Sequence, residues 1–254
     1  MQSIPRLVKW VLSVGIFLFV LMFLLRFGAW LAFRPTGLSF RDSLSTFWLG
    51  FRYDAREAGI VCLLLLLVGS LPALHPFKTR AGKNVALTLL FVSLLLLIIF
   101  YVFDFLHFRY LLQRLNASAL SFLEDAKISG SMVWQTYPVV RILLGIIIAL
   151  VLLFWIIRMI YRQIAKTNYT GSKAGRVSWS VLVFFLCALG IFGRIGQYPL
   201  RWSDAFNLGS DLKANLALNP FQSFFSSLSF RSSNFDQKKV QAYYPLMASY
   251  LGVD

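Results

Sequence analysis

The chain has 254 residues, of which 58% are hydrophobic and 17% aromatic, and its formal net charge is +15. This composition is too apolar for an ordinary soluble domain and is typical of a membrane protein. The 25 Lys and Arg residues are dispersed over many segments and form no single basic patch, so we expect no nucleic-acid partner.

Five apolar stretches lie in the first 195 residues, at about residues 8–33, 58–74, 85–103, 139–157 and 177–192. Their lengths are close to the roughly 17 to 25 residues that a membrane-spanning helix needs. We therefore predict an all-α, polytopic membrane protein with five transmembrane helices. The first stretch has no small-residue cleavage site and is interpreted as a retained span. Arg26 interrupts it near its C-terminal end, where the long side chain is expected to snorkel to the interface.

The segments that separate these stretches are sorted by charge. The alternate segments 1–10, 75–84 and 158–177 contain no Asp or Glu, and their charged residues are Arg6, Lys9, Lys78, Arg80, Lys83, Arg158, Arg162, Lys166, Lys173 and Arg176. All 10 acidic residues fall in the other set of segments. Because an excess of Lys and Arg in short loops marks the cytoplasmic face, we predict an inner N-terminus and an outer C-terminus.

This orientation divides the chain into a transmembrane domain, residues 1–194, and an extracytoplasmic helical linker, residues 195–254. The outer segment 34–57 is predicted to form a short amphipathic helix on the membrane surface. A second interfacial helix is predicted near residues 108–127. The linker has too few apolar residues in a continuous pattern to build a sizeable core of its own.

The sequence contains no P-loop, dinucleotide-binding fingerprint, zinc-protease motif or nucleophile elbow. Cys62 and Cys187 both lie in apolar stretches and are predicted to be buried free thiols. The topology separates His75 from His107, so these two histidines cannot share a site. His107 and Asp104 could together bind a head group or a metal ion, although a polar collar at a helix end is the favoured interpretation.

A cluster of charged residues precedes the second apolar stretch. Arg52 and Arg56 lie one helical turn apart, and two guanidinium groups in that arrangement can bind a phosphate. A structural charge network that includes Asp54 is the favoured alternative. The same two interpretations apply to the arginines that follow the fifth stretch. The candidate lipid head-group site therefore consists of Arg52, Asp54, Arg56, Arg194 and Arg201.

Three stretches carry a resemblance to a known family: GFRYDAREAGI at residues 50–60, YPLRWSDAF at 198–206 with NLALNPFQSFFSSL at 215–228, and YYPLMASYLGVD at 243–254. They resemble the N-terminal membrane region of lipoteichoic acid synthase-like phosphoglycerol transferases, in the alkaline phosphatase/sulfatase superfamily. The layout of five spans with an inner N-terminus is also similar to that of the family.

The resemblance implies the membrane anchor and lipid-side domain of a transferase. Such an enzyme would take phosphoglycerol (or phosphoethanolamine) from a phospholipid at the outer face of a bacterial cytoplasmic membrane. In the family, a threonine nucleophile and a divalent metal, usually manganese, lie in a catalytic domain after the linker. None of those residues has a counterpart here, so the resemblance implies no catalytic residue, metal site or cofactor in this chain. The implied partners are anionic membrane lipids and a C-terminal catalytic domain.

Two other interpretations remain open at this point. If the chain ends naturally at Asp254, it is expected to be a catalytically empty scaffold or accessory protein. A small transporter is less favoured, because polar groups deep inside spans mark transporters and the mid-span positions here are nearly all Leu, Ile, Val and Phe.

Overall fold

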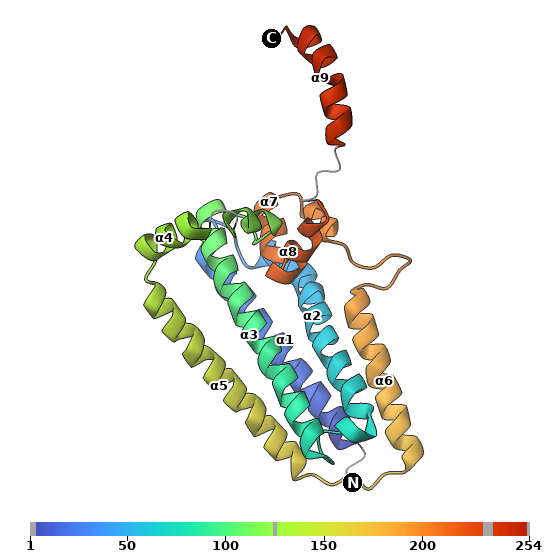
Figure 1. The fold of residues 1–254 in the computed structure, drawn as a ribbon. Helices are drawn as coiled ribbons and strands as arrows, with labels where there is room; N and C mark the ends of the chain where they lie inside the picture. Colours follow the sequence, from blue (N-terminus) through green and yellow to red (C-terminus); the bar gives the residue numbers. More distant parts are fainter. Residues whose placement is uncertain (1–3, 124–125, 231–235, 253–254) are drawn as a thin grey trace.

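A computed structural model describes residues 4–123, 126–230 and 236–252. The regular elements in these residues are all helices, which confirms the predicted all-α class. Five long helices pack side by side (Figure 1): α1 (Arg6–Phe33), α2 (Leu44–Ser70), α3 (Arg80–Leu111), α5 (Val139–Ala165) and α6 (Lys173–Phe192). The shorter α-helices are α4 (Ala126–Thr136), α7 (Asp211–Ala217), α8 (Pro220–Leu228) and α9 (Gln237–Leu251).

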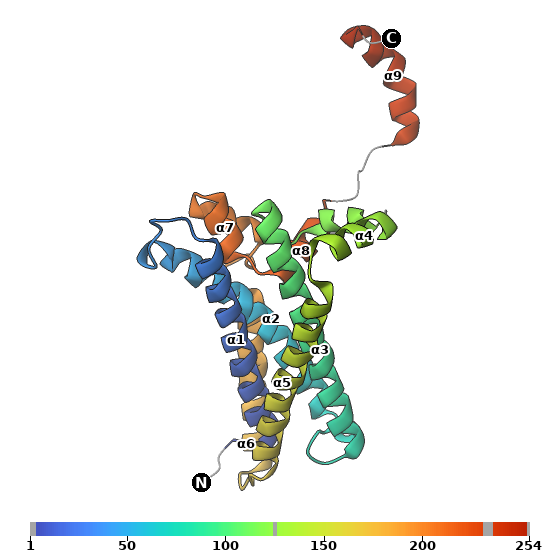
Figure 2. The same cartoon turned by 90° about the vertical axis from the view of Figure 1, so that its left-hand side faces the viewer.

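The two ends of the bundle are built differently (Figures 1 and 2). One end is covered by residues 198–228, which contain the 3-10 helix η4 (Trp202–Leu208), α7 and α8. We call these residues the cap and this end the cap end. The opposite end holds the start of α1, the α2–α3 turn and the α5–α6 loop, and we call it the basic end. Helix α9 follows residues 231–235 and lies apart from the bundle, beyond the cap.

Four of the described helices, α1, α3, α5 and α6, are long and apolar enough to cross a membrane. Helix α2 has 27 residues, within the range of 20 to 32 residues of the other four, but its first half carries several charged side chains. Asp54, Arg56 and Glu57 leave only the segment 58–70 uniformly apolar. Helix α2 is therefore long enough to cross a membrane, but its composition does not mark it as a span.

The two segments that were predicted to form interfacial helices differ from the sequence prediction. Residues 44–57 do not form a separate interfacial helix, because they are the first half of α2. The helix predicted near 108–127 is also wrong, because α3 ends at Leu111 and Leu112 adopts a left-handed conformation with φ 54°. The chain then turns back, and Arg114 forms a buried ion pair with Asp104 of α3. A buried ion pair between residues ten apart thus accompanies the end of a helix that local pattern alone would continue.

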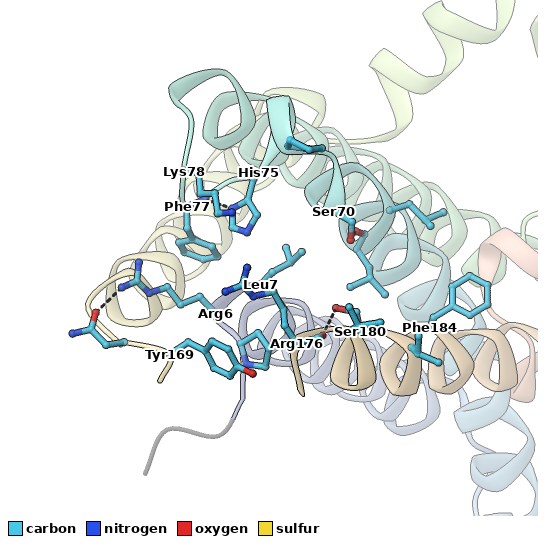
Figure 3. Close-up of a pocket in the computed structure, with 17 residues that line it drawn as sticks. Arg6, Leu7, Ser70, His75, Phe77, Lys78, Tyr169, Arg176, Ser180 and Phe184 are labelled. Atoms are coloured by element: carbon cyan, nitrogen blue, oxygen red, sulfur yellow. Dashed lines mark hydrogen bonds between the residues drawn. The ribbon is translucent and has the colours of Figure 1, made fainter. Parts of the chain in front are cut away.

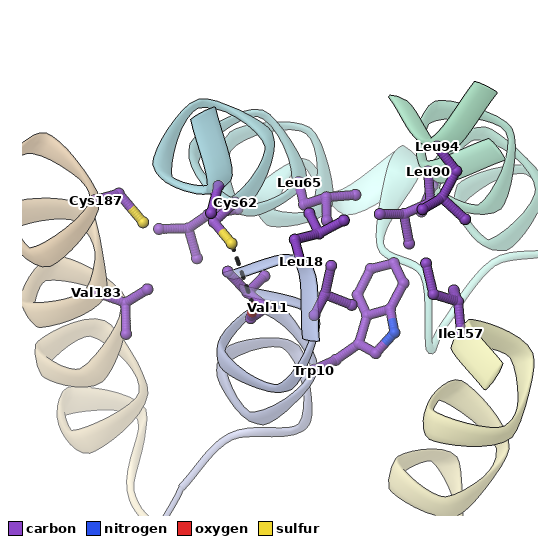
Figure 4. Packing of buried hydrophobic residues seen from close by; sticks show 14 of the residues in the cluster. Trp10, Val11, Leu18, Cys62, Leu65, Leu90, Leu94, Ile157, Val183 and Cys187 are labelled. Atoms are coloured by element: carbon purple, nitrogen blue, oxygen red, sulfur yellow. Dashed lines mark hydrogen bonds between the residues drawn. The ribbon is translucent and has the colours of Figure 1, made fainter. Parts of the chain in front are cut away.

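Helix α1 lies at the centre of the bundle. Its buried residues contact α2, α3, α5 and α6, and the cluster includes Trp10, Leu65, Leu90 and Ile157 (Figure 4). In contrast, only Ile157 and Ile164 of α5 are buried, so most of that helix presents Leu, Ile and Val outward. Outward apolar faces of this kind are suited to contact with lipid tails, because a lipid surround does not drive apolar side chains inward.

The cap packs on α1, α2 and α3 through two small apolar clusters. Tyr53 of α2 lies fully buried against Leu200, Ala205 and Ala214, and its hydroxyl donates a hydrogen bond to the Arg201 carbonyl at 2.7 Å. The second cluster joins Trp30, Phe47, Phe108 and Leu216. Part of the predicted linker is therefore fixed to the long helices of the bundle.

Candidate functional site

A groove of about 560 Å³ lies between α1, α2 and α6. Apolar side chains form most of its walls, including those of Ile16, Phe19, Phe51 and Leu186. At the cap end, Arg52 of α2 and Arg194, just after α6, line its mouth. The volume falls within the range of roughly 300–1,000 Å³ that small-molecule pockets occupy.

Glycines allow the helices beside the groove to approach closely. A Cβ atom on Gly59 would lie 3.2 Å from the Cys187 carbonyl oxygen, and one on Gly190 would lie 3.2 Å from the Ala55 carbonyl oxygen. Small residues at such positions are typical of helix pairs that pack inside membranes. Helices α2 and α6 therefore meet nearly backbone to backbone, and their close contact forms the floor of the groove.

The two arginines at the mouth keep part of their hydrogen-bonding capacity. Nε of Arg52 donates to the Gly193 carbonyl at 2.6 Å, and within the described residues its two terminal nitrogens make no hydrogen bond. Arg194 donates from Nε to the Tyr198 carbonyl at 2.7 Å, and its Nη1 lies 3.5 Å from Asp204. The backbone bonds fix both side chains beside the opening, while donors remain available to an anion.

Asp54 faces the interior and not the groove. It is fully buried, and its two carboxylate oxygens accept hydrogen bonds from Arg26 Nη2 at 2.6 Å and Arg26 Nε at 3.0 Å. Gly50 leaves room for this pair, because a Cβ atom there would lie 2.5 Å from the Arg26 guanidinium carbon. Asp54 thus takes part in a structural ion pair, as the favoured alternative for this cluster expected.

Arg56 is likewise occupied by protein partners. Its Nε donates to the Ile191 carbonyl at 2.8 Å, and its terminal nitrogens donate to the Leu200 carbonyl and the Gln222 side chain. The side chain therefore joins α2 to α6 and to the cap. Arg201 lies outside the groove, where its guanidinium stacks 5.3 Å from the centre of the Tyr198 ring. Of the five candidate residues, Arg52 and Arg194 are the two that share one opening.

The prediction that the Arg26 side chain snorkels to the membrane interface is wrong, because this side chain is buried inside the bundle. It is only 2% exposed and, besides Asp54, it donates to the carbonyls of Gly50, Leu216, Ala217 and Leu218. Arg114 acts in parallel, since it pairs with Asp104 and donates from Nε to the Asn215 carbonyl at 2.7 Å. The position of Arg26 inside an apolar stretch could have indicated this buried pairing, because a charged residue in a membrane span nearly always pairs with another polar group.

The possible site at Asp104 and His107 has a structural explanation. Asp104 accepts hydrogen bonds from Arg114 and from the Leu115 amide, and Nδ1 of His107 lies 3.0 Å from the Gln113 carbonyl. These contacts hold the turn after α3. The part of the chain that the structure describes contains no group of three or more His, Cys, Asp or Glu side chains placed to hold a metal ion.

Comparison with models of protein families finds no match to this chain, and searches of curated proteins and of solved structures also find no match. The groove and the two arginines that line it are therefore the features of this molecule that bear most directly on its function.

Proposed function

We propose that this chain is the membrane domain of a lipid-dependent phosphoglycerol (or phosphoethanolamine) transferase, and that the α1–α2–α6 groove holds the donor phospholipid. In this proposal α2 is a fifth span, the basic end faces the cytoplasm and the cap lies outside, beside the head groups. The observation that carries the proposal is the placement of Arg52 and Arg194 at the cap-end mouth of an otherwise apolar groove.

The ion pairing of α2 supports its role as a span. An unpaired charge inside the hydrocarbon region is costly, whereas a charge that is paired within the bundle avoids contact with lipid. Asp54 is paired with Arg26, and Arg56 is satisfied by carbonyl oxygens and by Gln222. Two of the charges that lower the apolar character of α2, Asp54 and Arg56, are thus turned toward protein, which favours a helix that crosses the membrane.

The dimensions of the groove fit one acyl chain. Along α6 the wall runs from Val183 to Gly193, and ten residues of α-helix rise about 15 Å. This length matches half of the roughly 30 Å hydrocarbon thickness of a bilayer. A chain lying against Leu186 and Phe51 would bring its phosphate to the level of Arg52 and Arg194. Guanidinium groups suit this role because they form directional, charge-assisted hydrogen bonds with phosphate oxygens.

The resemblance implies that the chemistry, with its manganese-like ion, belongs to a catalytic domain after the linker. The role proposed for this chain is therefore to bind and orient the donor lipid and to hold a catalytic domain near it. Tethering of this kind raises the effective concentration of enzyme at its substrate without any new contact. The cap, fixed by Arg26, Arg56 and Arg114, supplies a rigid base for such a domain.

Transfer from labelled lipid tests this function. In membranes from cells that express the intact gene, we expect transfer of the labelled head group from phosphatidylglycerol or phosphatidylethanolamine. The double variant Arg52→Gln/Arg194→Gln should lower the rate about tenfold or more, since charge-assisted hydrogen bonds are lost, while its membrane level stays unchanged. Arg201→Gln is the matched control and should keep the wild-type rate. Absence of transfer from both lipids in wild-type membranes would favour a scaffold role, and an unaltered rate in the double variant would refute the groove as the donor site.

A further inference from the structure

A second cavity lies at the basic end, on the opposite side of the bundle from the cap. Its volume is about 690 Å³, and it is enclosed by the start of α1, the end of α2, the α2–α3 turn and the start of α6. Figure 3 shows the side chains of Arg6, His75, Lys78 and Arg176 around its opening. The proposed transferase does not use this cavity.

The charges around this cavity all have the same sign. Arg6 donates to the Thr167 carbonyl and to Asn168 at 2.6 Å, which fixes its guanidinium at the rim. Within the described residues, neither Arg176 nor Lys78 has an acidic partner or a side-chain hydrogen bond. Burial and the neighbouring Lys78 lower the pKa of His75, so the imidazole is neutral near pH 7 and the positive charge comes from the other three residues.

Three cations around one partly enclosed space repel each other unless an anion lies between them. No Asp or Glu occurs in the segments that form this end of the bundle, so the protein supplies no counter-charge there. An exogenous anion would therefore be held by charge and by the donors of Arg176 and Lys78. This polar half of the cavity is suited to a phosphate group.

The other half of the cavity is apolar and opens to the side of the bundle. Leu67, Val177 and Val181 line it, and their side chains are 50%, 61% and 47% exposed, respectively. Such an opening allows a ligand to enter laterally with its tail along α2 and α6. A free phosphate would need only the cationic half, whereas a phospholipid would use both halves.

We infer that this cavity is a binding site for an anionic phospholipid of the inner leaflet, with the head-group phosphate between Arg6, Lys78 and Arg176 and an acyl chain against α2 and α6. The site is distinct from the proposed donor groove, which lies toward the cap end. A lipid bound here would contact the start of α1, the end of α2, the α2–α3 turn and the start of α6 at once.

A local fluorescence measurement tests the inference. Val177→Cys, labelled with bimane in a Cys62→Ala/Cys187→Ala background, places a reporter on the apolar wall. The protein is reconstituted in phosphatidylcholine vesicles that contain a minority of phosphatidylglycerol, with brominated chains on one lipid or the other. We expect brominated phosphatidylglycerol to quench more than brominated phosphatidylcholine at equal mole fraction. Lys78→Gln/Arg176→Gln should reduce this preference about tenfold or more, because each basic residue near a membrane contributes about fivefold to anionic lipid binding.

The matched control is Arg158→Gln/Lys166→Gln, which removes the same charge from exposed positions at the same end but outside the cavity. It should keep the preference. Equal quenching by the two lipids in the wild type, or an unchanged preference in Lys78→Gln/Arg176→Gln, would overturn the inference. Loss of the preference on addition of inorganic phosphate would also overturn it, by showing that the site takes the free anion. The Arg52→Gln/Arg194→Gln variant should leave this signal unchanged, which separates it from the donor groove.

Discussion

Replacement of Arg26 by leucine is expected to lower the free energy of unfolding by about 3–5 kcal/mol, because it leaves the buried carboxylate of Asp54 without its partner. The same substitution removes the donors that reach the carbonyls of Leu216, Ala217 and Leu218. The cap would lose its main polar attachment to α1. Unfolding by sodium dodecyl sulfate in mixed micelles measures the free energy, and limited proteolysis of residues 211–219 reports release of the cap.

Two further variants make this prediction specific. Arg34→Leu removes an exposed arginine from the end of the same helix, where it stacks over Trp30, and should cost about 1 kcal/mol or less. The double variant Arg26→Leu/Asp54→Leu should be more stable than Arg26→Leu alone, because no unpaired charge remains buried. If Arg26→Leu were no more destabilising than Arg34→Leu, the account of the cap would be wrong.

Replacement of Asp104 by leucine should also cost about 3–5 kcal/mol, since it strands the buried guanidinium of Arg114. Asp104 also accepts a hydrogen bond from the Leu115 amide at 2.9 Å, so the turn after α3 would lose its anchor. Hydrogen exchange should rise in residues 112–123 and in the neighbouring Asn215 segment. The exchange of α5, which does not contact this turn through buried residues, should not change.

Asp42 supplies the comparison for this second prediction. It is an exposed carboxylate at the same end of the bundle, and its pKa is lowered by hydrogen bonds from Ser39. Asp42→Asn should leave both the stability and the exchange of residues 112–123 as in the wild type. Equal exchange of residues 112–123 in the wild type and in Asp104→Leu would show that the Asp104–Arg114 pair does not hold the turn.

The long helices were predictable from the sequence because a continuous apolar stretch of roughly 17 to 25 residues is typical of a membrane-spanning helix. The helices extend beyond the predicted spans, as α3 does from Arg80 to Leu111, because polar residues continue a helix when nothing breaks it. For the same reason residues 44–57, which were predicted to belong to a surface helix, form the first half of α2. Thr79 and Ser172, whose side chains accept hydrogen bonds from the Gly82 and Gly175 amides, begin α3 and α6 as ordinary N-caps.

The cap was not predictable from local pattern. Its stability depends on contacts across long sequence separations, such as those from Arg26 to Leu216 and from Arg114 to Asn215. Periodicity carries no information about which carbonyl a buried arginine reaches. The sequence indicated that arginines could form the candidate site, but it did not indicate which of them would line it. Arg52 and Arg56 lie on one helix, yet only Arg52 lines the groove.

The most direct test of the account is to map where phosphatidylglycerol binds, with a photoactivatable diazirine on its acyl chain and peptide mass spectrometry of the adducts. We predict adducts on the α2 and α6 walls of the groove, between residues 48–59 and 183–195. They should be lost in Arg52→Gln/Arg194→Gln and kept in Arg201→Gln. Adducts spread evenly over the outward face of α5, or an unchanged pattern in the double variant, would contradict the claim that this groove holds a phospholipid.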